Sequence, residues 1–430
     1  MKYSIVTFGC RVNQADSLRL EEDLRARGLV EAGSLDADLV IVNTCSVTAS
    51  ADQAARQTIR RIARENPHAQ IVATGCYATR CADEVAALPR VVHVVRNAEK
   101  LNLVRMLSEQ SPVSPTLRSG VGALAKPDDG DGACGAAIEP GVAGRTAFTL
   151  RVQTGCEERC SYCIIPTTRG ASRSVPIADV VGEVERIASA GFKEIALTGV
   201  HLGSYGRDLQ PSASLLDLLC ALDAVDGDVT FRISSLEPMD CTPAIVALVA
   251  SSGRFLPHFH LPLQHASSRV LAAMRRPYTL DDYRRLVDGI VARLPHASIG
   301  SDMIVGFPGE TDEDFAENIS YLPESPLTHL HVFPYSDRPG TEAASMRDKV
   351  HGSVVRDRGA QLREIGSRLT ARFRQSQAGM VRPGLTLEDG TLVVTDNYLK
   401  VRIPPGRGRN ERVSVRLRIH GSEMRGEALA

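Results

Sequence analysis

The stretch FTLRVQTGCEERCSYCIIP, residues 148–166, joins a strand-like run to a loop that holds three cysteines. Cys156, Cys160 and Cys163 follow the run 148–155 with the spacing C-x3-C-x2-C. Three thiolates this close can ligate three irons of a 4Fe–4S cube, which leaves the fourth iron without a protein ligand. A zinc site short of one ligand and reduced core cysteines are the alternatives, and neither explains the spacing well. The open iron indicates a reactive cluster, because a closed cluster suffices for carrying electrons.

Strand-like and helix-like segments continue outward from this loop, over residues 147–372. The strand candidates are 148–155, 194–200, 229–235, 259–263, 298–306 and 330–335. Helix-like runs such as 180–191 and 279–294 lie between them. This alternation predicts an α/β unit that forms a barrel or part of one, a partial (β/α)6 barrel. By analogy with complete barrels, its site would lie at the C-terminal ends of the strands.

The first 107 residues repeat the same plan and predict an N-terminal α/β domain with a parallel sheet. Three lone cysteines, Cys10, Cys45 and Cys76, end strand-like runs and lie 35 and 31 residues apart. One βαβ unit takes about 30 residues, so the three thiols converge at one sheet edge if the strands are neighbours. Any one of them alone would be read as a buried small hydrophobe. Three in register favour a second cluster, again with one open iron.

Two further segments differ in composition from these domains. Residues 108–146 are rich in Gly, Pro and Ala and predict a flexible linker, in which Cys134 is incidental. Residues 375–430 show strand-like alternation with turn signals, which predicts a small β-barrel. Residues 371–430 hold 11 Lys and Arg against 6 Asp and Glu, an excess of 5 that fits a phosphate backbone or a solvated surface.

The composition sets the broad class of the protein. The 430 residues carry a formal net charge of −1, so any nucleic-acid surface must be local. No apolar run of about 18 residues exists, and the start lacks a secretory signal, so we expect a cytoplasmic protein without a membrane partner. Ten cysteines in such a chain favour metal or cluster ligation over disulfides. The absence of Trp makes an aromatic platform for stacking bases unexpected.

The cysteine loop resembles the radical S-adenosylmethionine superfamily, in which the open iron chelates S-adenosylmethionine. A chain with two open clusters resembles the methylthiotransferases, which insert sulfur at an unactivated C–H bond and then methylate it. The segments GCRVNQADS, NTCSVTASADQAARQTIRR and TGCYAT look most like the MtaB-type branch of that family. That branch modifies N6-threonylcarbamoyladenosine at position 37 of tRNA. Further similar segments are LTGVHLGSYG, RISSLEP, HLPLQHAS, IVGFPGET and FPYSDRPGT.

The resemblance implies a methylthiotransferase domain, a radical barrel and a TRAM-type RNA-binding domain. It makes Cys156, Cys160 and Cys163 ligands of the radical cluster, and Cys10, Cys45 and Cys76 ligands of an auxiliary cluster. It implies two 4Fe–4S clusters and S-adenosylmethionine as cofactors, with the chemistry done by them and not by a side-chain acid or base. The implied partners are a tRNA anticodon loop and an electron donor such as flavodoxin or ferredoxin, and the sulfur donor is left open.

Four further residues are implied near S-adenosylmethionine: Tyr162, Gly199, Glu237 and Gly306. The alternative roles are packing for the tyrosine, tight turns for the glycines and a surface salt bridge for the glutamate. Val175 departs from the pattern, because relatives often have Arg there. This puts one charged contact in doubt but not the reaction class.

Other features and functions stay open at this point. The basic helix with Arg56, Arg60, Arg61 and Arg64 fits a solvated face or a grip on phosphates. His260 and His265 fit packing or a substrate contact, and Ser50 with Gln53 fits a capping box. Cys81, Cys220 and Cys241 fit core or surface thiols better than ligands. Rival functions are methylthiolation of isopentenyladenosine or of a ribosomal protein aspartate, or a non-enzymatic Fe–S redox or RNA-binding role.

Overall fold

A computed structural model describes residues 1–110, 146–421 and 423–429. Its N-terminal domain holds a five-stranded parallel sheet of order β2-β1-β3-β4-β5. The elements are β1 (Lys2–Thr7), α1 (Arg11–Ala26), β2 (Val30–Glu31), β3 (Leu39–Thr44), α2 (Ala49–Glu65), β4 (Gln70–Gly75), α3 (Cys76–Arg80), α4 (Ala82–Ala86), β5 (Val91–Val95) and α5 (Leu103–Gln110).

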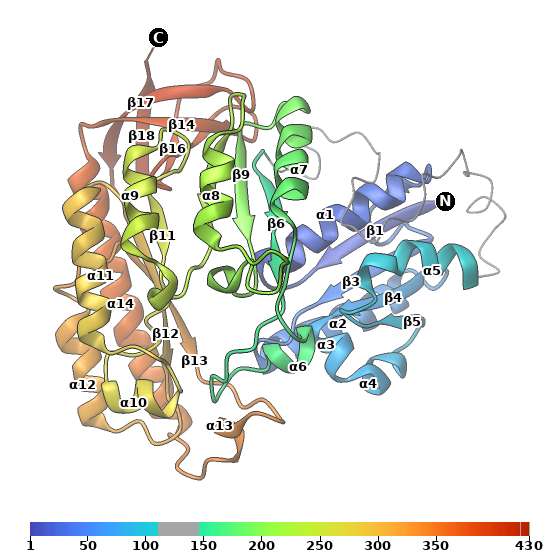
Figure 1. The fold of residues 1–430 in the computed structure, drawn as a ribbon. Helices are drawn as coiled ribbons and strands as arrows, with labels where there is room; N and C mark the ends of the chain where they lie inside the picture. The colour runs from blue at the N-terminus through green and yellow to red at the C-terminus, as the bar shows by residue number, and fades with distance from the viewer. Residues whose placement is uncertain (111–145, 422, 430) are drawn as a thin grey trace.

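Helices cover both faces of this sheet (Figure 1). Leu20 and Leu24 of α1 and Leu103 of α5 pack on one face, and Ile59 and Ile62 of α2 pack on the other. The central strand β3 is therefore buried along its whole length, which is why its sequence is nearly all apolar.

The central domain carries six parallel strands in two three-stranded sheets, β6-β9-β10 and β11-β12-β13. Its elements are β6 (Phe148–Arg151), β7 (Gln153–Thr154), α6 (Ile165–Arg169), β8 (Arg173–Ser174), α7 (Ile177–Ser189), β9 (Glu194–Thr198), α8 (Leu215–Asp223), β10 (Thr230–Ile233), α9 (Pro243–Ser251), β11 (His258–His260), α10 (Ser268–Ala273), α11 (Leu280–Arg293), β12 (Ser298–Val305), α12 (Asp312–Tyr321), β13 (His329–Pro334), α13 (Glu342–Ser345) and α14 (Gly352–Gln377). Short 3-10 helices cover Lys100–Asn102, Leu202–Ser204 and Pro238–Asp240.

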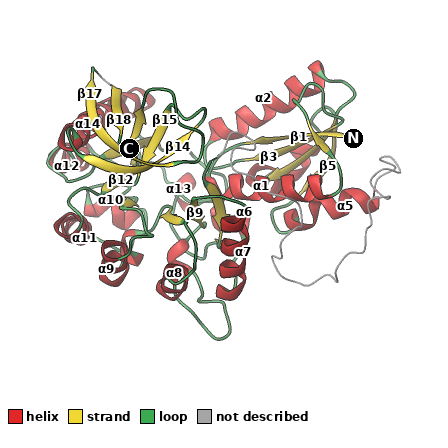
Figure 2. Cartoon of the chain, turned by 90° about the horizontal axis from the view of Figure 1, so that it is seen from above, coloured by secondary structure: helices red, strands yellow, loops and turns green. Residues whose placement is uncertain are grey.

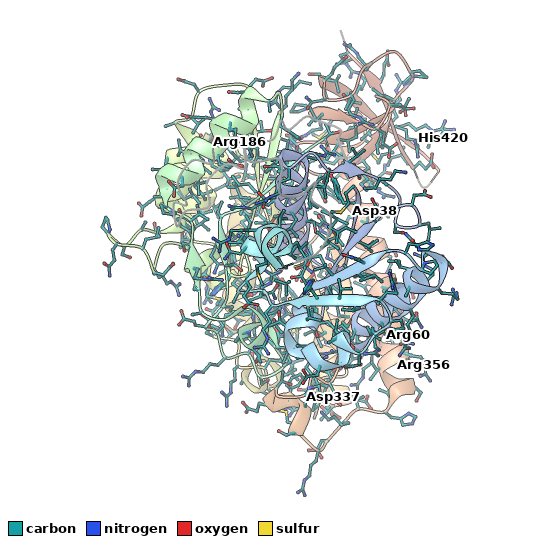
Figure 3. All side chains as sticks on the ribbon, turned by 90° about the vertical axis from the view of Figure 1, so that its right-hand side faces the viewer. Asp38, Arg60, Arg186, Asp337, Arg356 and His420 are labelled. Carbon is teal, nitrogen blue, oxygen red and sulfur yellow. The ribbon has the colours of Figure 1, made fainter. Side chains whose placement is uncertain are left out.

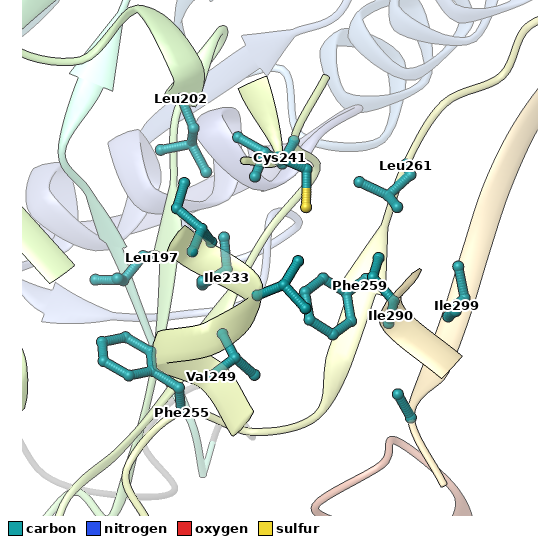
Figure 4. Close-up of a cluster of buried hydrophobic side chains, with 14 of the residues drawn as sticks. Leu197, Leu202, Ile233, Cys241, Val249, Phe255, Phe259, Leu261, Ile290 and Ile299 are labelled. Atoms are coloured by element: carbon teal, nitrogen blue, oxygen red, sulfur yellow. The ribbon is translucent and has the colours of Figure 1, made fainter. Parts of the chain in front are cut away.

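Backbone hydrogen bonds close the seam between the two sheets. The amide of Phe231 donates to the carbonyl of Arg254 at 2.7 Å, and that of Leu236 donates to the carbonyl of His260 at 3.0 Å. Helices such as α7, α8, α9 and α11 lie outside the strands (Figure 2). The core between strands and helices holds Leu197, Ile233, Phe259, Ile290 and Ile299 (Figure 4). The partial barrel that the alternating segments predict is confirmed.

The C-terminal domain is a closed barrel of order β14-β15-β16-β18-β17. Its strands are β14 (Val381–Leu387), β15 (Leu392–Thr395), β16 (Lys400–Arg402), β17 (Arg412–His420) and β18 (Glu423–Ala428). It lies against the N-terminal ends of the central strands (Figure 1). The side chain of Asn397 donates to the carbonyl of His296, just before β12, at 3.0 Å. The side chain of Arg412 binds Asp228, just before β10.

Some details depart from the sequence patterns or lie outside the described residues. Helix α2 begins at Ala49, and its N-cap is Thr48, whose Oγ1 accepts from the amide of Ala51 at 3.2 Å. The capping box at Ser50 is therefore wrong, because Ser50 already lies inside the first turn. Most of the expected linker, with Cys134, lies outside the described residues, and α5 extends to Gln110. Within the described chain, no helix combines the length and apolar character needed to cross a membrane.

Candidate metal centres

Cys10, Cys45 and Cys76, here called the strand-edge triad, follow β1, β3 and β4, which are neighbours in the sheet. Cys45 and Cys76 are 4% and 2% exposed, whereas Cys10 is exposed. Gly9 has a φ of +91°, and a Cβ placed on it would lie 2.5 Å from Cys45 Sγ. The segment that carries Cys10 therefore passes directly over Cys45, and only glycine leaves room for this approach.

Cys156, Cys160 and Cys163, here called the loop triad, lie between β7 and α6. A turn brings the last two together, since the amide of Cys163 donates to the carbonyl of Cys160 at 3.1 Å. The loop is fixed at both sides. The amide of Cys156 donates to the carbonyl of Gly170 at 3.0 Å, and that of Ser161 donates to the carbonyl of Met274 at 3.1 Å.

The spread of the sulfurs argues against a single metal ion at either triad. Thiolates on one tetrahedral zinc, each about 2.3 Å from the metal, lie about 3.8 Å apart. In neither triad, both of which lie wholly in described residues, do all three sulfurs come within 4.8 Å of one another. Three thiols spread around a wider space fit a multi-iron cluster better.

Burial keeps one thiol of each triad, Cys45 and Cys163, neutral in the metal-free protein. It raises the pKa of Cys45 to about 11, and the nearby Cys10 and Cys76 add to the shift. Burial also raises the pKa of Cys163 to about 12. Iron binding would therefore release protons from both triads, as is usual for thiolate ligation.

Each triad has polar or cationic neighbours that suit an anionic cluster. The side-chain amide of Asn97 donates to Cys76 Sγ at 3.6 Å, and Arg169 lies within electrostatic reach of Cys76 and Cys10. The guanidinium of Arg276 donates to Cys160 Sγ at 3.4 Å. Hydrogen bonds to cluster sulfurs and nearby charge are the main protein influences on such a group. The donor set at both triads therefore fits a 4Fe–4S cluster.

His201 is a further neighbour of the loop triad. Its Nε2 lies 2.8 Å from Asp240 Oδ2, and its ring also bonds to Cys156. Burial alone would lower the pKa of His201, but these two partners outweigh it and raise the pKa to about 10. A cationic His201 thus adds positive charge beside Cys156.

A buried ion network joins the N-terminal and central domains beside the strand-edge triad. Asp16 of α1 binds Lys100 at 2.9 Å, Arg169 of α6 at 3.3 Å, and Arg151 of β6. Burial alone would raise the pKa of Asp16, but the three cations outweigh it and hold the pKa below its ordinary range. Arg169 therefore reaches the strand-edge triad from the domain that carries the loop triad.

The four residues implied near S-adenosylmethionine have identifiable local roles. Tyr162 packs against the apolar cluster of Val270, Met274, Phe307 and Ala343. Gly199 lines a cavity, and a Cβ there would lie 2.9 Å from Leu202 Cδ2 and from Gln153 Oε1. Glu237 binds Arg276, whose side chain is 3% exposed. Gly306 has a φ of +77°, and its amide donates to Glu310. Their contact with S-adenosylmethionine stays a prediction.

A cavity of about 510 Å³ lies where the three domains meet. Its lining includes Cys10 and Arg11 of the N-terminal domain, Gly199 and Ser234 of the central domain, and Tyr398 of the C-terminal barrel. The strand-edge triad therefore opens into this cavity through Cys10. The cysteines of the loop triad are not among its lining residues, whereas Gly199 and Ser234, close in sequence to His201 and Glu237, are.

The sequence patterns left several of these residues unassigned. Arg169, Arg276 and Asp240 carry no local signal, because their partners are distant in the chain, and His201 was marked only by its place in LTGVHLGSYG. Arg11 directly follows the predicted ligand Cys10 within GCRVNQADS. This position was the only feature of the sequence that pointed to a role for Arg11.

The weaker sequence features have local explanations. His265 is fully buried. Its Nδ1 accepts from the amide of Ser267 and its Nε2 contacts the side chain of Asn318, so His265 has a packing role. His260 instead lines the cavity. Arg56 binds Tyr77 and Glu84, whereas Arg60 projects from α2 at the molecular edge (Figure 3). The three cysteines that were expected to be core or surface thiols differ in burial. Cys241 lies in the hydrophobic core (Figure 4), Cys220 is exposed and Cys81 is half-buried.

Two family descriptions match this chain. The uncharacterized protein family UPF0004 matches residues 2–96, and the radical SAM superfamily matches residues 150–322. Among solved structures, the radical S-adenosylmethionine methyltransferase TsrM from Kitasatospora setae has a similar fold. It gives a TM-score of 0.55 at 17% identity, over 80% of this chain and 73% of that chain.

Curated relatives cover almost the whole chain. The threonylcarbamoyladenosine tRNA methylthiotransferase MtaB of Aquifex aeolicus is 36% identical, over 94% of this chain and 96% of its own. The protein of the same name from Bacillus subtilis is 34% identical, over 92% and 88%. The tRNA-2-methylthio-N(6)-dimethylallyladenosine synthase of Streptomyces avermitilis is 31% identical, over 90% and 77%.

Proposed function

This chain belongs to the radical S-adenosylmethionine methylthiotransferase family, and we propose that it methylthiolates carbon 2 of N6-threonylcarbamoyladenosine at position 37 of tRNA. The observation that carries the proposal is the presence of two cysteine triads in one chain, one of which opens through Cys10 into a cavity between the three domains. Sulfur insertion at a C–H bond requires both a radical source and a bound sulfur, which two clusters on one chain would supply. The relatives that support this substrate are 36% and 34% identical to the chain.

In this proposal the loop triad holds the cluster that binds S-adenosylmethionine, and the strand-edge triad holds a second cluster. The bound groups supply radical cleavage of a C–H bond, sulfur and a methyl group. Arg276 and His201 place positive charge beside Cys160 and Cys156, which stabilises thiolates there. Arg169 places positive charge near Cys76, and the neutral amide of Asn97 donates a hydrogen bond to the Cys76 sulfur.

The remaining residues orient substrate and exclude water. The walls of the cavity come from three domains, so an inserted base would be enclosed on several sides. Chemistry on a base requires it to leave the stack, and position 37 lies in a loop where this costs little. The basic C-terminal barrel borders the same cavity through Tyr398 and Lys400, where the RNA backbone would approach.

Iron counting and cysteine replacement test the two-cluster part of the proposal. Reconstituted protein is expected to hold about eight irons per chain, as two cubes. Replacing Cys10, Cys45 and Cys76 together by Ala should preserve formation of 5′-deoxyadenosine but abolish methylthiolation. Replacing Cys156, Cys160 and Cys163 should abolish both 5′-deoxyadenosine formation and methylthiolation. Cys220→Ala, at an exposed position of α8, is the matched control. Methylthiolation by the first triple variant would contradict the proposal.

The substrate has a second candidate, dimethylallyladenosine in tRNA. The relative named for that nucleoside is 31% identical, only slightly less than those named for threonylcarbamoyladenosine. Nucleoside analysis of tRNA from a deletion strain separates the two. Loss of the 2-methylthio group from threonylcarbamoyladenosine alone supports the proposal. Loss from dimethylallyladenosine alone would show that dimethylallyladenosine is the substrate.

A further inference from the structure

The cavity shared by the three domains has both polar and apolar lining surface, and apolar atoms make up the larger share. The aliphatic or phenyl side chains among its lining residues are Val12, Leu399, Phe333 and Phe373. Several histidines, serines and basic residues make up much of the remainder. Selection of a polar substrate group would therefore depend on individual side chains and not on the lining as a whole.

Arg11 is the cation that reaches this cavity from the strand-edge triad. Its Nη1 donates to Ser234 Oγ at 3.2 Å, and its Nη2 donates to Tyr398 Oη at 3.0 Å. Its guanidinium also lies 5.9 Å from the centre of the Tyr398 ring. Ser234 of the central domain and Tyr398 of the C-terminal barrel therefore fix the position of this guanidinium, and both hydrogen-bond partners are neutral hydroxyl groups.

No ion pair within the described residues involves Arg11. The acidic side chain that lines the cavity, Asp302, is bound by two other residues. Its Oδ1 lies 3.0 Å from His260 Nε2 and 3.1 Å from His331 Nδ1. Burial alone would raise the pKa of Asp302, but these imidazoles hold it below its ordinary range. The positive charge of Arg11 is thus not neutralised by the cavity's own carboxylate.

Two of the neighbouring histidines, His258 and His329, add no positive charge to that of Arg11 in the cavity. Burial lowers the pKa of His258 well below its ordinary value and that of His329 to about 4. Both rings are therefore neutral near pH 7. The rings of His258 and Tyr398 are tilted by 42° with centres 4.4 Å apart, so His258 packs against the same tyrosine that holds Arg11.

We propose that Arg11 binds the carboxylate of the threonylcarbamoyl group and so selects this nucleoside over one with an apolar N6 substituent. The inference rests on the proposed function. The threonylcarbamoyl group ends in a carboxylate and a hydroxyl, whereas the dimethylallyl group has no polar atom. A planar guanidinium held by neutral hydroxyls is matched to a carboxylate, since two parallel N–H donors bind its two oxygens. Tyr398 is a positioning residue, because it acts by orienting Arg11.

The test compares two anticodon stem-loops of identical sequence, carrying either threonylcarbamoyladenosine or dimethylallyladenosine at position 37. Binding to reconstituted protein is measured by fluorescence anisotropy without reductant, and methylthiolation is measured separately as kcat/KM. Arg11→Gln should weaken binding of the threonylcarbamoyl stem-loop by about ten- to hundred-fold, as loss of a charged hydrogen-bond donor does. Binding of the dimethylallyl stem-loop should change by less than about two-fold.

Further variants separate recognition from structural damage. Tyr398→Phe removes the hydroxyl that holds Arg11, at a position far in sequence from any cysteine. It should weaken binding of the threonylcarbamoyl stem-loop alone by about three- to ten-fold. Arg11→Lys keeps the positive charge but lacks the paired N–H donors of the guanidinium. It should bind the threonylcarbamoyl stem-loop more tightly than Arg11→Gln and less tightly than the wild-type protein. Arg285→Gln, on the exposed face of α11, is the matched arginine control. Iron content of each variant is counted alongside.

The outcomes distinguish this inference from the proposed function. If the wild-type protein methylthiolates only the dimethylallyl stem-loop, the proposed substrate is wrong. If the wild-type protein prefers the threonylcarbamoyl stem-loop and both Arg11→Gln and Tyr398→Phe keep that preference, Arg11 is not the selecting residue. Equal weakening of both stem-loops by Arg11→Gln, at unchanged iron content, also overturns the inference, because it indicates a contact with the shared RNA backbone.

Discussion

The loop triad and the strand-edge triad present the same three thiols but are built in opposite ways. The loop triad spans eight residues of one turn between β7 and α6. The strand-edge triad draws on three strands over residues 10–76 and is bordered by Arg169 of the other domain. The first is set by local chain geometry, and the second depends on sheet register and on how two domains pack. Disturbing the neighbours of each triad should therefore have different consequences for iron binding.

The largest effect is expected at Asp16, which neutralises three cations beside the strand-edge triad. Asp16→Asn leaves Lys100, Arg151 and Arg169 buried without their carboxylate and should lower the free energy of unfolding by about 3 kcal/mol or more. Iron at the strand-edge triad should fall, while formation of 5′-deoxyadenosine persists. Denaturant unfolding and iron analysis measure the two effects. Asp228→Asn, at the exposed pair with Arg412, is the control and should cost less than about 1 kcal/mol.

The same replacement carries a pH signature with a definite sign. The pKa of Asp16 lies below its ordinary value in the folded protein, so its stabilisation is present above about pH 4 and is lost as the pH falls. The wild-type protein should therefore lose stability in acid more steeply than Asp16→Asn. Parallel curves for the two proteins would show that folding does not lower the pKa of Asp16.

Gly9 is expected to give the next largest effect, again confined to the strand-edge triad. Gly9→Ala forces a side chain into a left-handed backbone and against Cys45 Sγ, at a cost of about 2 kcal/mol. Iron should fall from about eight to about four per chain. Gly182→Ala on the exposed side of α7, where a Cβ meets nothing within 4 Å, is the matched control. Full iron in Gly9→Ala would mean that Cys45 does not ligate the cluster in this geometry.

The contrast between the triads also explains what the sequence could predict. The loop triad was visible as a motif because its ligands are local. Cys10, Cys45 and Cys76 could be related only through the period of the βαβ unit, and that inference required neighbouring strands, which the structure has. Arg169 and Arg276 could not be assigned, because their partners come from packing between distant elements. The capping error at Ser50 arose because Thr48, two residues earlier, can bond equally well to the first turn.

Arg276 tests the loop triad with a smaller expected effect. Arg276→Gln removes a buried cation that bonds to Cys160 Sγ and Tyr278 Oη and should cost about 1.5 kcal/mol. Iron content should stay unchanged, because all three ligands lie in one anchored loop. The reduction potential of that cluster should fall, since less positive charge favours the oxidised state. A redox titration followed by electron paramagnetic resonance measures the shift, with Arg285→Gln on exposed α11 as control. Loss of iron would show that the loop alone does not hold the cluster.

The smallest effect is expected at Thr48, three residues after Cys45. Its Oγ1 accepts from the amide of Ala51, so Thr48→Ala should cost about 1 kcal/mol through fraying of α2. Thr48→Ser keeps the hydroxyl and should behave as the wild-type protein in the same denaturant titration. Iron at the strand-edge triad should be unaffected by Thr48→Ala, because Cys45 is fixed by the end of β3 and by Gly9 above it. If iron is lost instead, the start of α2 positions Cys45, and the end of β3 alone does not. The strand-edge triad would then depend on α2 as well as on the sheet.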